Sequence, residues 1–421
     1  MTHVARMAMQ QKQGDAMYED YYGNLITSLA MANDKKIVLL VMDGLGDAPN
    51  ATGKTPLQAA IKPNLDALAG QSACGLLVPV ATAVTPGSGP GHLGLFGYDP
   101  LIYQVGRGVL SALGVEFPLE DRDVAARLNF CTIDKSGNIA DRRAGRIPDE
   151  ENRRVLEKIR KGLKTPAGVE VFFTTEAEHR AVLVLRGNNL DDNIGDTDPQ
   201  HTGVPPLKAN RAPYDKSPTA AIAANIIEQV QKMLADEPKA NMIVARGFAK
   251  HPAWPKFPDR YKVKPAAVAG YPMYRGVAKL VGIPVVAKPT TAQDVCAEAA
   301  KAMAEHSFVF AHFKYTDKTG EDGDYDGKVK RIEEMDKALP TLLAAKPDVL
   351  IITGDHSTPC VLKSHSWHPV PVLMKAPWLR GGQVAKFDEV NCRGGEIGTI
   401  PSRELLPLAM AHAGKLEKFG A

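Results

Sequence analysis

The chain has 421 residues, 44% of them hydrophobic, and its 51 Lys and Arg residues against 48 Asp and Glu residues give a formal net charge of +3. This length is sufficient for two or three compact domains, and the hydrophobic fraction is typical of globular proteins. The balanced charge, without a basic stripe, argues against a general nucleic-acid-binding protein. No apolar run approaches the roughly 18 residues of a membrane span.

Cysteine usage and the N-terminal residues indicate where the protein resides. The N-terminus has no apolar core of a secretory signal. Five cysteines stand far apart without CxxC spacing, a pattern typical of reduced thiols rather than a disulfide framework. They are Cys74, Cys131, Cys296, Cys360 and Cys392. We therefore expect a cytoplasmic protein that has no membrane partner.

Residues 1–34 show no clean hydrophobic period, and we expect them to be an N-terminal extension. Regular signals follow. The short apolar runs 36–43, 307–313 and 348–355 predict buried strands. The segment 217–234 predicts a helix, because Ser217 is placed to cap it and Pro218 takes the first helical position.

Strands that alternate with helices predict an α/β fold built on a doubly wound, mostly parallel sheet. The middle of the chain has strand-like runs of its own, "AVLVLRG" and "NMIVARG", and Pro-rich breaks. We therefore predict that residues 35–118 and 265–421 form one domain and that residues 119–264 form a second α/β domain inserted into it.

Three carboxylates fall where predicted strands end. Asp43 and Asp355 end two of the runs, and Asp317 lies just past the third. In doubly wound sheets, ligands bind outside the carboxyl ends of the strands, and acids gathered there repel one another unless cations neutralise them. A single acid of this kind is as often a helix N-cap, but the set, with His356 and His365 nearby, predicts two neighbouring divalent metal sites.

The loop "TPGSGPGHLGLFGYDP", residues 85–100, contains one serine, Ser88, among glycines and prolines. Taken alone, it is best interpreted as a series of tight turns. Beside a metal cluster, however, a serine hydroxyl gains a lowered pKa and can attack phosphorus. His92, four residues later, either orients this loop or packs in the core.

Several motifs together carry a family resemblance. "VMDGLGD", "PGSGPGHLGLFGYDP", "NFCTIDKSGNIADRRAGRI", "EHRAVLVLRG", "HFKYTDKTGEDGD" and "GDHSTPCVLKSHSWHPVPV" occur in this order, from about residue 36 onward. The chain thereby resembles the archaeal-type, cofactor-independent phosphoglycerate mutases of the alkaline phosphatase superfamily. The resemblance implies an alkaline-phosphatase-like fold and conversion of 3-phosphoglycerate to 2-phosphoglycerate through a phosphoserine.

The same resemblance assigns the metal ligands. It makes Ser88 the nucleophile and implies two divalent ions, one of them held by Asp43, Ser88, Asp355 and His356. The second would be held by Asp317, Glu321 and His365. The family usually has histidine where this chain has Glu321, and a carboxylate there favours Mn or Mg over Zn. We expect Mn first, with Mg, Co and Zn as alternatives.

The resemblance also implies residues that bind a small phosphorylated hydroxy acid, most of them on the inserted domain. They are His92, Asp141, Arg142, Arg143, His179, Arg180, Arg246 and Lys314. We expect at least one of these arginines to form only an ordinary surface pair. Two alternatives stay open: a phosphatase or phosphotransferase of the same superfamily acting on another metabolite such as homoserine, and a non-catalytic phosphometabolite-binding protein.

Overall fold

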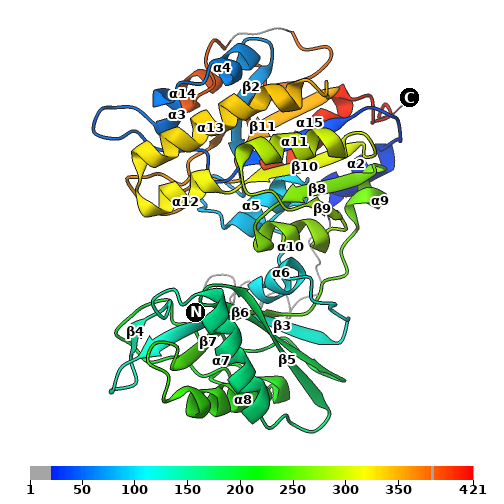
Figure 1. The fold of residues 1–421 in the computed structure, drawn as a ribbon. Coiled ribbons are helices and arrows are strands. Elements are labelled where there is room, and N and C mark those ends of the chain that lie inside the picture. Colours follow the sequence, from blue (N-terminus) through cyan, green and yellow to red (C-terminus); the bar gives the residue numbers. More distant parts are fainter. Residues whose placement is uncertain (1–19, 381–383, 421) are drawn as a thin grey trace.

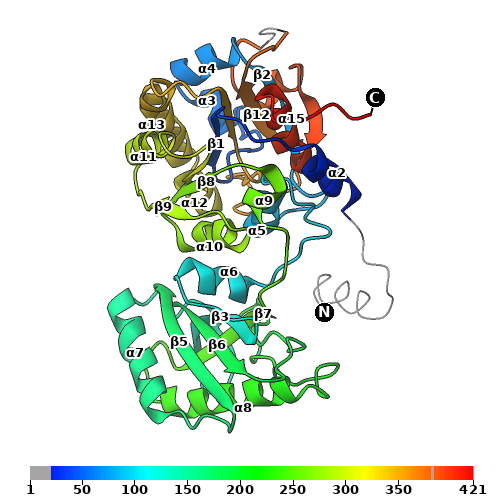
Figure 2. The same cartoon turned by 90° about the vertical axis from the view of Figure 1, so that its right-hand side faces the viewer.

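The computed structural model describes residues 20–380 and 384–420. Figures 1 and 2 show two lobes, each built around its own sheet, and the chain passes from the first lobe to the second and back again. Residues 1–19, part of the predicted N-terminal extension, lie outside the described residues. Among the described helices, none is both long and apolar enough to cross a membrane.

The first lobe contains an eight-stranded sheet with the strand order β13-β2-β12-β11-β1-β10-β8-β9. Only β12 runs antiparallel to its neighbours, so the predicted mostly parallel sheet is confirmed. In chain order the strands are β1 (Ile37–Met42), β2 (Ala73–Val78), β8 (Pro265–Ala269), β9 (Val285–Ala287), β10 (Phe308–Phe313), β11 (Val349–Thr353), β12 (Val370–Lys375) and β13 (Gly398–Pro401).

Helices cover both faces of this sheet. Burial on both faces explains why the sequence of β1 is apolar throughout. Leu39 and Val41 pack into the core on one face, and Leu40 and Met42 pack into the core on the other. One face is covered by α5 (Ser88–Leu95), α9 (Phe257–Tyr261), α10 (Pro272–Leu280) and α15 (Leu405–His412). The other is covered by α3 (Pro56–Ala59), α4 (Pro63–Ala69), α11 (Ala292–Ala302), α13 (Tyr325–Leu343) and α14 (Glu389–Cys392).

The second lobe contains a five-stranded antiparallel sheet, in which β3 lies between β6 and β7. Its strands are β3 (Asp123–Ile133), β4 (Ile139–Asp141), β5 (Val169–Ala177), β6 (Arg180–Gly187) and β7 (Met242–Ala249). The helices α7 (Asp149–Gly162) and α8 (Pro218–Leu234) pack on one face of this sheet. The predicted cap of α8 is confirmed, because the side chain of Ser217 accepts a hydrogen bond from the backbone N–H of Ala220.

Helix α6 (Arg107–Gly114) joins the lobes. It packs on the other face of the second sheet and also against α10 of the first lobe. Glycine permits this approach: a Cβ on Gly276 would lie 2.0 Å from the carbonyl oxygen of Leu110, and one on Gly114 would lie 2.2 Å from that of Pro272. The two helices therefore meet at backbone contact.

The described part of the predicted N-terminal extension belongs to the first lobe. Helix α2 (Tyr21–Leu29) places Ile26 in the hydrophobic core that also contains Ile37 and Leu39 of β1. Its capping residue Asp20 accepts a hydrogen bond from the N–H of Gly23 and forms a 2.7 Å ion pair with Arg260, which is almost fully buried.

Candidate active site

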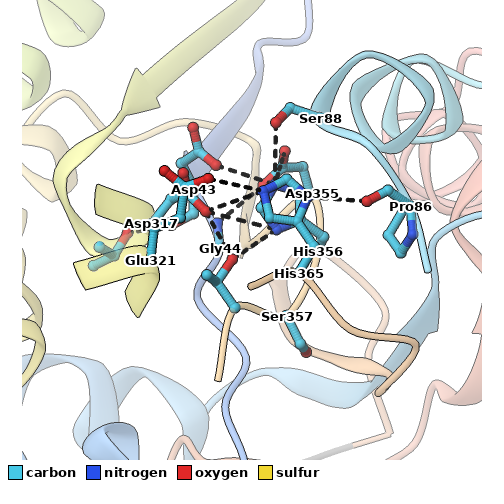
Figure 3. A network of polar contacts seen from close by, with 12 residues as sticks. Asp43, Gly44, Pro86, Ser88, Asp317, Glu321, Asp355, His356, Ser357 and His365 are labelled. Atoms are coloured by element: carbon cyan, nitrogen blue, oxygen red, sulfur yellow. Dashed lines mark hydrogen bonds and ion pairs between the residues drawn. The ribbon is translucent and has the colours of Figure 1, made fainter. Parts of the chain in front are cut away.

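Three acids meet at one edge of the first sheet (Figure 3). Asp43 follows β1, Asp355 lies two residues after β11, and Asp317 lies in the first turn of α12 (Tyr315–Asp322), which follows β10. Because β11, β1 and β10 are neighbours in the sheet, their carboxyl ends bring these side chains together. All three residues are at most 1% exposed.

The first candidate ligand group consists of Asp43, Asp355 and His356, whose ligand atoms all lie within 4.8 Å of one another. The Nε2 atom of His356 lies 3.4 Å from Oδ1 of Asp43 and 3.1 Å from Oδ2 of Asp355. The hydroxyl oxygen of Ser88 lies 3.2 Å from the same nitrogen. The structure therefore brings together all four residues expected around one ion.

The second candidate group consists of Asp317, His356 and His365. Nε2 of His365 lies 3.5 Å from Oδ1 of Asp317, and the rings of His356 and His365 stack with centroids 3.6 Å apart. Glu321, which the resemblance assigns to this ion, lies 3.9 Å from Nε2 of His365 with 55% of its side chain exposed. Glu321 thus stands at the rim of the group.

The donor set fits divalent cations. Both carboxylate oxygens of Asp43 and Oδ2 of Asp355 are buried and accept no hydrogen bond from the described residues. Buried carboxylate oxygens without partners are costly unless a cation compensates them. Mixed Asp and His ligation is typical of Mn²⁺, Zn²⁺ and related ions.

A lysine already lies between the two groups. Nζ of Lys314 lies 3.2 Å from Oδ2 of Asp43 and also forms an ion pair with Asp317. Burial opposes the charged forms, but this ion pairing holds the pKa of Asp43 well below its usual value and that of Lys314 well above its own. Burial also lowers the pKa of His365, but its 3.5 Å contact with the Asp317 carboxylate outweighs burial and raises that pKa to about 9.

Ser88 opens the buried helix α5, and the backbone folds closely around it. A Cβ on Gly91 would lie 2.4 Å from the carbonyl oxygen of Asp355, so the glycine lets the helix approach the end of β11. Nδ1 of His365 lies 2.9 Å from the carbonyl oxygen of Pro86, which ties the loop to the second group. Free N–H groups at a helix N-terminus attract anions, so a phosphate beside Ser88 would be stabilised.

His92 does not lie where a substrate contact was expected. Its side chain is fully buried, with Nδ1 lying 2.8 Å from the carbonyl oxygen of Ser88 and 3.1 Å from Oδ2 of Asp355. It therefore lies behind a candidate metal ligand and the Ser88 loop, a position compatible with both interpretations, loop orientation and packing.

The predicted substrate residues of the second lobe have different surroundings. Asp141 accepts hydrogen bonds from the N–H groups of Arg143 and Gly145 and so shapes the turn after β4. Arg142 pairs with the buried Asp198 at 3.0 Å. Arg143 is exposed, and it forms no ion pair with any residue that the structure describes.

The other predicted residues lie on the strands. Burial and the positive charge of Arg180 lower the pKa of His179 to about 3. Nη1 of Arg180 donates a 3.0 Å hydrogen bond to the hydroxyl of Tyr271, which belongs to the first lobe. Burial and the charge of Arg107 lower the pKa of Arg246 to about 10.

Two further arginines lie near the predicted substrate residues, although the sequence motifs did not point to them. Arg127 on β3 is 8% exposed, faces Arg246 across the β3–β7 pair, and forms no ion pair within the described part of the chain. Burial and the charge of Arg246 lower its pKa to about 9. Arg107 reaches toward the Ser88 loop, because its Nη2 lies 3.8 Å from the position of a Cβ on Gly87. A cation inside the apolar run "DVAARLNF" was the available signal for Arg127.

These arginines require an anion. Arg127 is buried without an ion pair among the described residues, whereas Arg246 is partly buried and lies 4.0 Å from Oδ2 of Asp198. A carboxylate or phosphate ligand would stabilise such a cluster of partly desolvated cations. A cavity of about 360 Å³ opens between the lobes and is lined by residues of both, including Arg180, Tyr271, Lys314 and Glu321. The arrangement can hold a small polyanion between the arginines and the carboxylate–histidine centre.

Comparisons with known proteins identify the family to which the chain belongs. The family model described as 2,3-bisphosphoglycerate-independent phosphoglycerate mutase matches residues 69–240. Probable 2,3-bisphosphoglycerate-independent phosphoglycerate mutases of Thermosipho africanus and Thermus thermophilus are 50% and 49% identical to the chain, covering 94% of it and 98% and 99% of their own lengths.

Solved structures give the same result. A cofactor-independent phosphoglycerate mutase of Thermoplasma acidophilum is 31% identical, with a TM-score of 0.65, over 90% of this chain and 100% of that one. The PH0037 protein of Pyrococcus horikoshii is 30% identical, with a TM-score of 0.79, over 92% of this chain and 99% of that one. The chain belongs to the archaeal-type 2,3-bisphosphoglycerate-independent phosphoglycerate mutase family.

Proposed function

We propose that the protein interconverts 3-phosphoglycerate and 2-phosphoglycerate in a metal-dependent reaction with Ser88 as the phosphorylated residue. The observation that carries this proposal is the position of Ser88, at the start of α5 and 3.2 Å from Nε2 of His356 in the first ligand group. High identity to probable phosphoglycerate mutases over 94% of the chain supports the same reaction and substrate.

Two divalent ions, one in each ligand group, would supply a lowered pKa for the Ser88 hydroxyl and neutralise charge on the transferring phosphoryl group. Asp43, Asp355 and His356 would hold the first ion with Ser88. Asp317 and His365 would hold the second, together with Glu321, as the resemblance implies, or with His356, as the geometry groups them. Mn²⁺ is the ion we propose.

The transfer needs two displacements in one site. Oγ of Ser88 attacks phosphorus and the bond from phosphorus to the C3 oxygen breaks, so Ser88 loses a proton and the C3 oxygen gains one. The C2 hydroxyl of the retained glycerate then attacks the phosphoserine. That step restores the Ser88 hydroxyl and releases 2-phosphoglycerate. No water enters the balance, so the site must exclude it.

The second lobe holds the glycerate between these steps. Arg127 is buried and Arg246 and Arg180 are half-buried, and bidentate pairing with carboxylate or phosphate suits their guanidinium groups. Since His179 has a pKa of about 3, its imidazole stays neutral at physiological pH and can accept a hydrogen bond from a substrate hydroxyl. Lys314 adds a positive charge on the first-lobe side.

A coupled assay tests the function. Protein freed of metal with a chelator and resupplied with Mn²⁺ is given 3-phosphoglycerate without any bisphosphoglycerate, and enolase reports 2-phosphoglycerate while free phosphate is followed in parallel. We expect metal-dependent 2-phosphoglycerate with little phosphate. Release of phosphate alone would instead establish a phosphatase. If neither 2-phosphoglycerate nor phosphate forms, other phosphorylated acids and amino alcohols such as homoserine would be tested next.

Replacing the nucleophile gives the first testable prediction. Ser88→Ala should lower mutase turnover by at least about a thousandfold, because no covalent acceptor is left, while the thermal unfolding temperature changes little. The neighbouring loop variant Thr85→Ala, which removes a hydroxyl outside the ligand groups, should keep most of the activity. If Ser88→Ala kept the turnover of the unmodified protein, the nucleophile assignment would be wrong.

A further inference from the structure

A histidine that the proposed mechanism leaves without a role lies directly behind the first ligand group. His312 sits near the end of β10, in the otherwise apolar run "FVFAHF", and is 2% exposed. Its ring stacks on that of Tyr274 of α10, with centroids 3.7 Å apart and an interplanar angle of 24°. The stack fixes the plane of the imidazole.

This imidazole faces one specific oxygen. Nε2 of His312 lies 3.3 Å from Oδ2 of Asp43. Nζ of Lys314 lies 3.2 Å from the same oxygen, and it also donates a 3.0 Å hydrogen bond to the hydroxyl of Tyr274. The other oxygen of Asp43, Oδ1, is turned toward His356. The carboxylate is therefore held from behind through one oxygen and presents the other to the ligand group.

The second ring nitrogen shows why a histidine in this place needs an explanation. Both ring nitrogens of His312 are buried and make no regular hydrogen bond with the described residues, but Nε2 keeps its 3.3 Å contact with Oδ2 of Asp43. A neutral imidazole carries one proton, and only a proton on Nε2 reaches an acceptor here. An apolar side chain of similar size would fill the space without an unpartnered nitrogen, so packing alone does not account for the residue.

We propose that His312 is a positioning residue for Asp43: held flat against Tyr274, it fixes the carboxylate orientation that leaves Oδ1 free to bind a divalent cation. Side chains that hydrogen-bond a metal ligand from behind commonly set its orientation and basicity. The inference rests on the metal-dependent function proposed above, and it assigns the role to Nε2 rather than to the ring as a whole.

Binding of Mn²⁺ to the metal-free full-length protein, measured by titration calorimetry without substrate, tests this role. We expect His312→Leu to bind Mn²⁺ about 10- to 100-fold more weakly than the unmodified protein. His312→Gln should recover affinity to within about threefold, because its amide nitrogen reaches the place of Nε2. His312→Asn should stay weak, because its amide nitrogen reaches only the place of Nδ1. The His306→Leu variant, far from the site, is the control and should bind normally.

A packing role predicts a different pattern. It allows the stability of the metal-free protein to change while Mn²⁺ affinity does not, so the thermal unfolding temperature of each chelated variant is measured alongside. Unchanged Mn²⁺ affinity in His312→Leu would overturn the proposal. Equal Mn²⁺ affinities of His312→Gln and His312→Asn would overturn it as well. This second comparison does not depend on whether the leucine variant folds. Absence of Mn²⁺ binding in the unmodified protein would overturn the metal-dependent function itself.

Discussion

At the scale of single residues, Arg127 is a buried cation, and we propose that the substrate supplies its counter-charge. It lies opposite Arg246 on the neighbouring strand and forms no ion pair within the described chain. Arg127→Met should raise KM for 3-phosphoglycerate about 10- to 100-fold, as expected for loss of a charged hydrogen bond of roughly 1.5–3 kcal/mol. Steady-state kinetics of the purified variant measures this.

The stability of the same variant separates binding from folding. Because Arg127→Met removes a desolvated charge that is repelled by Arg246, the ligand-free protein should unfold at the same temperature or a higher one. The exposed Arg153→Met on α7 is the matched control and should change neither KM nor stability by much. A large loss of stability with an unchanged KM would show that Arg127 is structural.

Glu389 gives a pH dependence that does not involve the candidate ligands. Burial raises its pKa to about 7, although its carboxylate accepts hydrogen bonds from the hydroxyl of Thr55 and the N–H of Asp47. A raised carboxyl pKa means that the folded state binds the proton more tightly than the unfolded state does. This group's stabilising contribution is therefore complete below about pH 4.5 and is lost as the pH rises through 7.

Glu389→Gln should remove that dependence. Its denaturant unfolding free energy should change less between pH 5 and pH 8 than that of the unmodified protein, and at pH 8 it should exceed it by roughly 1–2 kcal/mol. Glu305→Gln, at an exposed position, should keep the original pH profile. Parallel profiles for the unmodified protein and Glu389→Gln would contradict the assignment.

At the scale of elements, the crossing of α6 and α10 sets how the lobes are joined. A Cβ on Gly276 would clash with the backbone of Leu110, so Gly276→Ala must push the helices apart. Overpacking of this kind typically costs about 1–3 kcal/mol, which thermal unfolding would detect. Gly70→Ala at the end of α4 meets nothing closer than 3.6 Å and should be tolerated. Equal stability of the two variants would show that the crossing adapts freely.

The strands of the two sheets show which features the sequence could predict and which it could not. Strands β1, β10 and β11 were recognisable because both of their faces are buried, and the acids after them met because those strands are neighbours. Arg127 and His312 were missed, since their roles depend on partners brought from other strands and helices. Arg127 lies opposite Arg246 because of the register between β3 and β7. That register depends on tertiary structure, and the hydrophobic periodicity of a single segment does not predict it.

At the scale of the whole molecule, the domain limits remain a proposal. The strands of the first sheet fall within 37–78 and 265–401, and those of the second within 123–249, which is compatible with an insertion at 119–264. Phe257 and Tyr261 of α9, however, pack in the core of the first lobe. We therefore propose that the chain returns to the first domain between β7 and α9, before the predicted residue 265.

The contact between the lobes should decide whether the protein acts as a mutase or as a phosphatase. Arg180 of β6 donates a 3.0 Å hydrogen bond to the hydroxyl of Tyr271, and both residues line the cavity between the lobes. Tyr271→Phe keeps the ring but removes this link, so the lobes should separate more readily during the phosphoserine stage that we propose. Water that enters then competes with glycerate, because sequestration of a reactive intermediate depends on closure.

We expect Tyr271→Phe to raise free phosphate relative to 2-phosphoglycerate by about three- to tenfold, with a smaller change in total phosphoryl transfer. Lys288→Ala is the control, since it removes an exposed ion pair with Glu116 rather than a contact in the cavity, and exposed pairs contribute little. An unchanged product ratio in Tyr271→Phe would mean that water is excluded by other contacts, with the crossing of α6 and α10 the first to test. A raised ratio would instead place the control of reaction outcome in the contact between the lobes, because the candidate metal ligands are the same in both proteins.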